Sequence, residues 1–446
     1  MHIDFTKGNI TKQLISFSIP IMVGNLFMQL YQYVDSVIVG KFLGKEALAA
    51  VGACNPFSFM LISLVIGVSM GTTITIAQYF GKKDFDSVKK AADSLYIFLF
   101  FAYIFTFSFG IIFNEQIFNF IDLPKELLPI ATEYLNIYLI GLIFLFGFNC
   151  LSAILRGVGD SVTPLKFLIF SSIVNVVLDL LFVIVFDWGV KGVAWATVTS
   201  QAISFIFAVL FTNKNSSIIK LDLLKLKYDK KIFMEGVKIG LPAGLQQLFV
   251  SLGMLAILSI VNSYGTNTIA AFTAAGRIES VIFIVPMSLA LSLTSFVAQN
   301  YGANNFDRIR NGLNSGLKIA LNSSFLFLII LSALAEPLMK MFTSVPEIIE
   351  IGCQYLYVFG VSYSLFATMF CYMGVLRGMR NTLVPMFITV LSLWLIRVPI
   401  ANILSSYLGE LGIWLASTAS WAVGMALSIF YFRHFFKKKH LQIKEN

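Results

Sequence analysis

The chain has 446 residues, of which 58% are hydrophobic and only 12% charged, with 44 phenylalanines and a formal net charge of +9. An ordinary soluble domain carries about 25% charged residues, so this composition excludes a soluble globular protein and a disordered or collagen-like chain. An integral membrane protein fits, because lipid is its solvent. We expect no nucleic-acid partner, because the placement of the positive charges along the chain is explained by the orientation of the chain in a membrane.

Cysteine, histidine and glycine motifs give no sign of catalytic chemistry. The four cysteines are scattered through apolar segments and the three histidines lie near the termini, so we expect neither a disulfide framework nor a metal centre. Gly67 to Gly71 fits G-x-S-x-G, but it lies within an apolar span and is interpreted as helix-packing glycine. The sequence therefore predicts no enzyme, no cofactor and no metal beyond a transported Na+.

Twelve apolar stretches reach the length of about 20 residues that a helix needs to cross a bilayer. Short polar breaks with turn-forming residues separate them, and the longest polar stretch divides the chain almost in half. The sequence thus predicts an all-α polytopic membrane protein. The expected spans lie near residues 14–39, 47–78, 91–113, 129–155, 164–186, 190–212, 233–262, 268–298, 311–335, 350–376, 384–405 and 410–433.

Positive charges set the orientation of such spans, because Lys and Arg gather in the cytoplasmic loops. Most of the 32 Lys and Arg residues fall on one side if the N-terminus is cytoplasmic. We therefore expect a multi-pass protein of the plasma membrane, an inner membrane where there are two, with both termini in the cytoplasm. The expected domains are lobes at 1–213 and 232–446, joined by a cytoplasmic linker at 214–231.

The two halves of the chain share landmarks at an almost constant offset of 221 residues. Six spans separate equivalent points, so the halves have the same orientation, and parallel repeats of this kind enclose a central cavity in transporters. The duplication favours a transporter over a channel or a membrane enzyme. Matching pairs are 44–50 with 265–271, 77–81 with 298–302, and 155–157 with 376–378.

Ionisable side chains within a membrane span are costly and mark functional sites by default. Asp35 lies roughly 8 Å from the outer end of its span, and Asp179 and Thr197 lie roughly 10 Å deep. Asn175 is one turn from Asp179 on the same helix face. Carboxylate, amide and hydroxyl oxygens at one depth predict a site for H+ or Na+. The alternative is that these groups only hold helices together.

A second set of charges lies in the other half of the chain, at Arg277, Glu279 and Arg397. A structural ion pair of Glu279 with Arg397 or Arg277 is the favoured interpretation, because intramembrane charges usually pair with one another. The alternative is that Glu279 lines a substrate cavity, where its carboxylate meets cationic substrates. Gln29 and Asn149 are also candidate cavity residues, and they fit interhelical hydrogen bonds equally well.

Several motifs follow one another in a fixed order and recur in the second half of the chain. Pro20 is followed by Gly24, Gln29-Leu30-Tyr31 and Val34-Asp35-Ser36, and Gly240-Leu241-Pro242 repeats the start of this pattern. Over the whole chain, this order and recurrence resemble the multidrug and toxic compound extrusion (MATE) family. It implies a V-shaped bundle of two six-helix lobes and cation-coupled export by rocking of the lobes.

Within that family the DinF-like branch is the most similar. Its cation site uses an Asp on helix 1, an Asn and an Asp one turn apart on helix 5, and a Thr on helix 6. Asp35, Asn175, Asp179 and Thr197 match these positions. The acidic residues that the NorM-like branch carries on helices 7 and 10 have no counterpart here. The resemblance also implies bending of helix 1, which Pro20 and Gly24 would make easy.

These observations together predict a secondary active multidrug efflux antiporter. It would export amphipathic, often cationic organic compounds in exchange for H+ or Na+ by rocker-switch alternating access. The alternative within the superfamily is a flippase for lipid-linked precursors. We expect small-molecule substrates, the lipid bilayer as the only other partner, and a monomer.

Overall fold

The computed structural model describes residues 3–120, 123–216, 218–222 and 225–444. All regular secondary structure in these ranges is helical. The helices are α1 Ile10–Ile38, α2 Gly44–Gly81, α3 Phe85–Phe120, α4 Leu128–Gly157, α5 Val162–Leu180, α6 Gly189–Asn215, α7 Lys230–Asn262, α8 Thr266–Gly302, α9 Phe306–Lys340, α10 Pro346–Gly378, α11 Leu383–Val390, α12 Val398–Leu408 and α13 Glu410–Lys444, with π-helical segments η1 Val39–Leu43, η2 Leu181–Val185 and η3 Leu391–Arg397.

Eleven helical stretches in the described ranges are long and apolar enough to cross a membrane. The first of them, Ile10–Cys54, covers α1, η1 and the start of α2, and so includes parts of two expected spans with a turn at Gly44 between them. The segments α11, η3 and α12 form one continuous crossing, Leu383–Leu408. The expected set of twelve membrane helices in an all-α fold is thereby confirmed.

The turns between helices repeat at the offset found in the sequence. Residues with a positive φ, a conformation that only glycine adopts without strain, occur at equivalent places in the two halves. The duplication therefore extends from the sequence to the backbone geometry of the connections. The equivalent pairs are Gly44 with Gly265, Lys83 with Asn304, Gly159 with Arg380, and Gly189 with Gly409.

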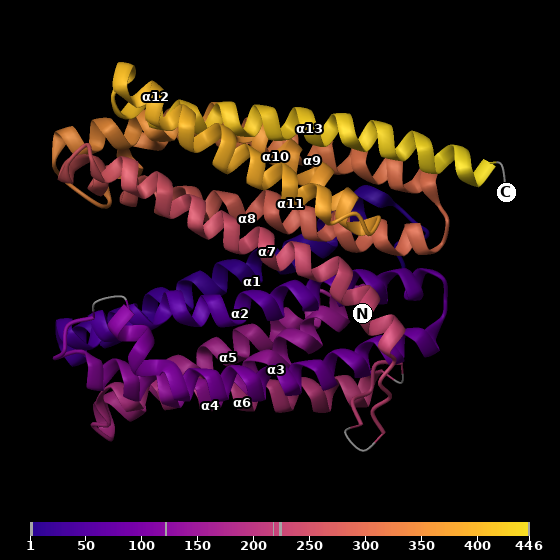
Figure 1. The fold of residues 1–446 in the computed structure, drawn as a ribbon, viewed down its shortest axis with the longest axis horizontal. Coiled ribbons are helices and arrows are strands. Elements are labelled where there is room, and N and C mark those ends of the chain that lie inside the picture. Colours follow the sequence, from indigo (N-terminus) through magenta and orange to yellow (C-terminus); the bar gives the residue numbers. More distant parts are fainter. Residues whose placement is uncertain (1–2, 121–122, 217, 223–224, 445–446) are drawn as a thin grey trace. The chain divides into compact units, whose positions relative to one another are not determined.

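The chain forms two compact units. Unit 1 consists of Met1–Asp4 and Ile19–Gly244, and unit 2 of Phe5–Ser18 and Leu245–Asn446. Figure 1 shows α4 and α6 side by side in unit 1, and α10 and α13 side by side in unit 2. Within unit 1, α4 packs against α2, α3 and α6, and α5 packs against α6.

The units differ from the expected lobes 1–213 and 232–446 at their edges. The first part of α7, as far as Gly244, belongs to unit 1, and the first part of α1 belongs to unit 2. Each of these helices thus begins in the unit that is built mainly from the other half of the chain.

Glycines explain why the first part of α7 belongs to unit 1. A Cβ atom at Gly71 of α2 would lie 2.0 Å from the carbonyl oxygen of Gly236, and one at Gly67 would lie 2.7 Å from the Cα atom of Gly244. Only glycine permits backbones to approach so closely, as in small-xxx-small contacts between membrane helices. The interpretation of Gly67 and Gly71 as packing residues is confirmed.

The first part of α1 and the residues before it are held in unit 2 through Phe5. The Phe5 N–H donates to Gln299 Oε1 at 3.0 Å, and its carbonyl oxygen accepts from Asn300 Nδ2 at 3.0 Å and Arg308 Nε at 2.7 Å. The fully buried ring packs edge-on against Phe296. Backbone and side chain of Phe5 are therefore both enclosed by unit 2.

Candidate functional site

Polar side chains from three helices meet inside unit 1. Asp35 comes from α1, Asn175 and Asp179 from α5, and Thr197 from α6. The last three are almost completely buried, with exposed fractions of 1%, 0% and 4%. The residues that sequence reasoning placed at one depth thus lie together.

Hydrogen bonds order this cluster. With its amide suitably oriented, Asn175 donates from Nδ2 to Asp179 Oδ2 at 2.8 Å and accepts at its oxygen from the Thr197 N–H at 3.3 Å. Asn175 therefore joins α5 to α6 and fixes one oxygen of Asp179. The oxygens Asp35 Oδ1 and Asp179 Oδ1 are buried and have no partner among the described residues.

The carboxyl groups of Asp35 and Asp179 are close enough to interact electrostatically. An ionised carboxylate only accepts hydrogen bonds, so the two groups can hydrogen-bond to each other only when one of them carries a proton. Two carboxylates in one low-dielectric site cannot both be ionised without a shared proton or a bound cation. The pair can therefore take up and release one proton.

Tyr31 belongs to the same cluster, and sequence reasoning missed it as a site residue. It lies one turn before Asp35 on α1, within reach of Asp35, Asp179 and Thr197. The spacing of four residues from Asp35 is the signal that could have identified it, because residues i and i+4 share a helix face. Tyr31 adds a phenol hydroxyl from α1 to the cluster.

A π-helical segment follows each of the two acids. The segment η1 begins at Val39, one turn after Asp35, and η2 begins at Leu181, two residues after Asp179. Short π-helical turns inside α-helices occur frequently at functional sites, because the wider turn changes the directions of neighbouring side chains. Both acids are thus next to an irregular turn of their own helix.

The cluster is confined to the first repeat. At the offset of 221 residues, Asp35, Asn175 and Asp179 correspond to Ala256, Ile396 and Ile400. These apolar residues cannot bind a proton or a cation. The site is therefore a departure from the internal symmetry of the chain.

A cavity of about 90 Å³ adjoins the cluster within unit 1. Tyr31 and Asn175 belong both to its wall and to the cluster. The remaining lining is a mixture of apolar and hydroxyl-bearing side chains from α1, α4, α5 and α6. These are Met28, Leu145, Phe148, Leu168, Ser171, Ser172, Ser200, Gln201 and Ser204.

The residues expected to permit bending of the first helix lie within an unbroken α1. Pro20 is inside the helix, and a Cβ atom at Gly24 would only touch the side chains of Leu165 and Leu168 at 3.5 Å or more. Pro20 follows directly on the position, between Ser18 and Ile19, where α1 passes from unit 2 to unit 1. Its role in bending stays a prediction.

The two neutral cavity candidates differ in their surroundings. Asn149 on α4 donates from Nδ2 to the Leu145 carbonyl of its own helix at 2.9 Å, so that donor is already satisfied. Gln29 on α1 and Asn149 are both partly exposed. A role of either residue in a substrate cavity stays a prediction.

The charges of unit 2 are arranged differently from the expected ion pair. Glu279 on α8 is buried and accepts a hydrogen bond from the Tyr355 hydroxyl of α10. Within the described residues it forms no ion pair of 4 Å or less with Arg397 or Arg277, but Arg397 is close enough to act on it electrostatically. Arg397, at the end of η3, contacts Met254 Sδ of α7 through Nη1 at 3.9 Å, and its Nε is buried without a partner among the described residues. Glu279 thus bonds directly to Tyr355 and interacts with Arg397 at longer range.

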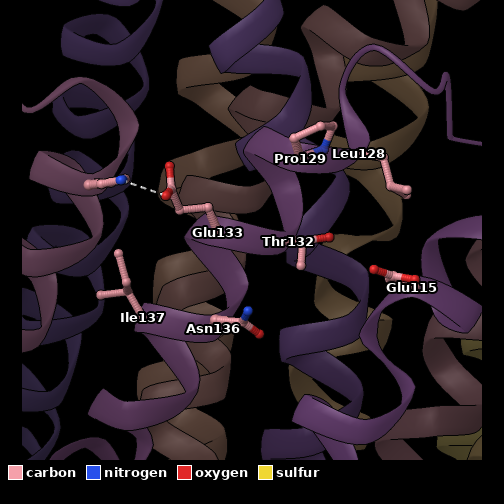
Figure 2. A pocket seen from close by; sticks show the side chains of 8 residues that line it. Glu115, Leu128, Pro129, Thr132, Glu133, Asn136 and Ile137 are labelled. Carbon is pink, nitrogen blue, oxygen red and sulfur yellow. Dashed lines mark ion pairs between the residues drawn. The ribbon is translucent and has the colours of Figure 1, made fainter.

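A pocket of about 610 Å³ lies beside the first turns of α4 (Figure 2). An ion pair of 2.7 Å between Glu133 and Lys191 spans part of it, and both side chains are about half exposed. Exposed ion pairs contribute little to stability. The pocket shares no residue with the Asp35–Asp179 cluster. Its lining is Glu115, Leu128, Pro129, Thr132, Glu133, Asn136, Ile137 and Lys191.

A duplicated bundle of membrane-crossing helices with a buried carboxyl pair defines a multi-pass membrane protein of the transporter class. The family model MatE matches the chain twice, at residues 20–181 and 242–403. These two matches confirm the internal duplication and include every residue of the first repeat's cluster except Thr197. The chain belongs to the MatE family.

Relatives match over nearly the entire chain. The probable multidrug resistance protein YpnP of Bacillus subtilis is 31% identical, over 97% of this chain and 96% of its own length. The FAD transporter of Shewanella oneidensis is 25% identical, over 91% of both chains. A crystal structure of MATE in the straight conformation has a TM-score of 0.90 at 25% identity, covering 98% of each chain.

Proposed function

We propose that the protein is a secondary active exporter of amphipathic, often cationic organic compounds, driven by protons that bind at Asp35 and Asp179. The observation that carries this proposal is the meeting of these two carboxyl groups, each with a buried oxygen that has no partner among the described residues, inside a membrane-crossing bundle. A single proton changes the net charge of such a buried pair and thereby its packing. The relative YpnP is named as a probable multidrug resistance protein, which supports the substrate class.

The arrangement of Asn175 favours H+ over Na+. Its amide presents a donor to Asp179, while its oxygen accepts from the Thr197 N–H. A Na+ ion would need that oxygen as a ligand, because hard cations are held by several oxygens. A proton shared by two carboxyl groups needs no further ligand.

The exchange would follow from competition between proton and substrate. When the carboxyl pair is protonated, its charge is reduced and α1 is free to change its packing near Pro20. When the pair loses its proton, the negative charge attracts a cationic substrate. The two lobes would then expose the site alternately to the two sides of the membrane.

The distribution of positive charge gives the proposed orientation in the membrane, and this orientation gives the direction of the exchange. Both termini and the segment before α7 face the cytoplasm, so Asp35 and Asp179 lie in the outer half of the membrane. Protons would enter from outside, and substrate would leave there.

Accumulation of fluorescent cationic dyes in cells tests the substrate class. Cells that produce the protein should retain less dye than cells that produce the Asp35→Asn variant at equal abundance. A proton ionophore should abolish the difference. Equal retention across a broad dye panel, together with movement of lipid-linked precursors, would favour the flippase alternative instead.

A second candidate is export of anionic, cofactor-like compounds. The relative from Shewanella oneidensis is named as an FAD transporter, and the buried Arg397 of this chain has an Nε without a partner. A buried guanidinium is stabilised by an anionic partner. Release of flavin nucleotides into the medium, lost in Arg397→Met but retained in Arg277→Met, would support this candidate.

A further inference from the structure

The cavity of about 90 Å³ in unit 1 extends from the acid cluster toward the turn that joins α4 to α5. Along α5 it begins at Asn175 and continues past Ser171 and Ser172, away from Asp179. Along α6 it is lined by Ser200, Gln201 and Ser204. Since a water molecule occupies about 30 Å³ in the liquid, the cavity can hold roughly three.

The serine hydroxyl oxygens in the wall of this cavity are free to accept hydrogen bonds from water. Ser171 Oγ donates to the Ser200 carbonyl at 3.3 Å, and Ser200 Oγ donates to the Thr197 carbonyl at 2.9 Å. Ser204 Oγ donates across to the Phe167 carbonyl of α5 at 2.8 Å. Each hydroxyl proton is thus already used, which leaves the oxygen lone pairs for water.

The same face of α6 remains polar beyond the cavity. Thr197, Ser200, Ser204 and Thr212 follow one another at intervals of three, four and eight residues, and each is at most 4% exposed. Thr212 lies about 12 Å beyond Ser204 along the helix. Its hydroxyl oxygen is buried and has no partner in the part of the chain that the structure describes, and the same holds for Asp179 Oδ1 at the opposite end of the route. Buried polar atoms of this kind commonly bind water.

We propose that this cavity and the hydroxyl face of α6 are the route by which the coupling proton leaves the Asp35–Asp179 pair toward Thr212. The inference rests on the proposed function. A carboxyl group gives its proton to a water molecule in the cavity and becomes a carboxylate. The protonated water passes a proton to the next water as far as Ser204, and further water molecules along the helix would carry it to Thr212, so water is the only other reactant.

The Ser204→Val variant tests the route in proteoliposomes. Valine fills part of the cavity and removes an acceptor oxygen, so the maximal rate of gradient-driven dye efflux should fall about tenfold. The KM for the dye should stay within about twofold of the wild-type value if the cavity carries protons and not the dye. Ser324→Val is the matched control. Ser324 is a buried serine of α9 in unit 2 whose hydroxyl donates to the Ala320 carbonyl of its own helix.

A second variant tests hydration directly, without requiring transport. In a protein lacking the four buried native cysteines, Ser204→Cys should react with a small water-soluble methanethiosulfonate, and Ser324→Cys should not. Absence of labelling at position 204 would contradict a water-filled route.

The kinetic results separate this inference from the function on which it rests. Unchanged efflux by Ser204→Val, beside an active wild type and an inactive Asp35→Asn, would refute the route alone. A KM that rises as much as the maximal rate falls would make the cavity a substrate site and would also refute it. A wild-type protein without gradient-driven efflux would refute the proposed coupling and the route together.

Discussion

Asp84 and Asn305 occupy equivalent places in the two repeats, and each caps the helix that follows it. Asp84 Oδ1 accepts from the Ser87 N–H at 3.1 Å, and Asn305 Oδ1 accepts from the Arg308 N–H at 3.2 Å. The hydrogen bonds from Ser87 lower the pKa of Asp84 below its usual value. Only the cap of the first repeat can therefore respond to pH.

Asp84→Ala should lower the free energy of unfolding by about 1 kcal/mol at pH 7, the usual contribution of an N-cap. Because the folded-state pKa of Asp84 is depressed, this stability is present above the unfolded-state pKa of about 3.9 and is lost as pH falls through the folded-state value. Asp84→Asn should retain the cap without that pH dependence. Thermal unfolding in detergent at pH 7 and below pH 4 measures both variants, and equal behaviour of the Ala and Asn variants would contradict the account.

At the scale of residues, sequence reasoning located the cluster but not its internal contacts. The fixed rise of an α-helix placed Asp35, Asp179 and Thr197 at one depth, and the structure brings them together. The partners of Tyr31 and Glu279 could not be derived in this way. They depend on how each helix is rotated about its own axis, which spacing along one helix does not define.

At the scale of helices, the contact between α2 and α7 depends on glycine. A Cβ atom at Gly71 would overlap the backbone of Gly236 and Gly240, whereas one at Gly52 of the same helix would meet nothing within 4 Å. Gly71→Ala should therefore destabilise unit 1 by about 1 to 3 kcal/mol, the usual cost of overpacking.

Gly52→Ala is the matched control for that substitution and should be neutral. The melting temperature of the purified protein in detergent distinguishes the two variants. A Gly71→Ala protein as stable as Gly52→Ala would mean that α7 does not depend on this contact.

Pro20 gives the second prediction at this scale. The missing N–H removes one hydrogen bond of α1, so Pro20→Ala should stiffen the helix. We expect turnover to slow several-fold while the affinity for dye changes less, because bending is part of the cycle and not of binding. Pro337→Ala, a proline inside α9, is the control. If the Pro20 variant had lower affinity and unchanged turnover, bending at this position would play no part in the cycle.

The elements themselves were largely predictable. Apolar length identified the spans, and turn-forming residues such as those at Gly81 to Asp84 identified their ends. The π-helical segments after Asp35 and Asp179 were not predictable, because no residue type or sequence pattern distinguishes them from the α-helix around them. The place where α7 changes unit was also missed, since the polar stretch at 214–231 suggested an earlier boundary, and the glycines that hold α7 act only in three dimensions.

At the scale of the whole molecule, the distribution of positive charge predicts the orientation in the membrane. Lys220, before α7, should face the cytoplasm, and Lys45, at the start of α2, should face outward. Both side chains are exposed.

In a variant lacking the four native cysteines, a membrane-impermeant maleimide added to intact cells should label Lys45→Cys and not Lys220→Cys. Permeabilised cells should show labelling of both. Labelling of Lys220→Cys in intact cells would reverse the orientation and, with it, the direction of proton entry.

The central claim is that a proton shared by Asp35 and Asp179 drives export. The most direct test is dye efflux from proteoliposomes in which either a pH gradient or a Na+ gradient is imposed. The account predicts efflux by the wild-type protein under the pH gradient, and no gradient-driven efflux by an Asp35→Asn protein that still folds and inserts. Asp179→Asn should strongly weaken the dependence on the gradient. Full gradient-driven efflux by Asp35→Asn would contradict the claim and would make the carboxyl pair a structural contact.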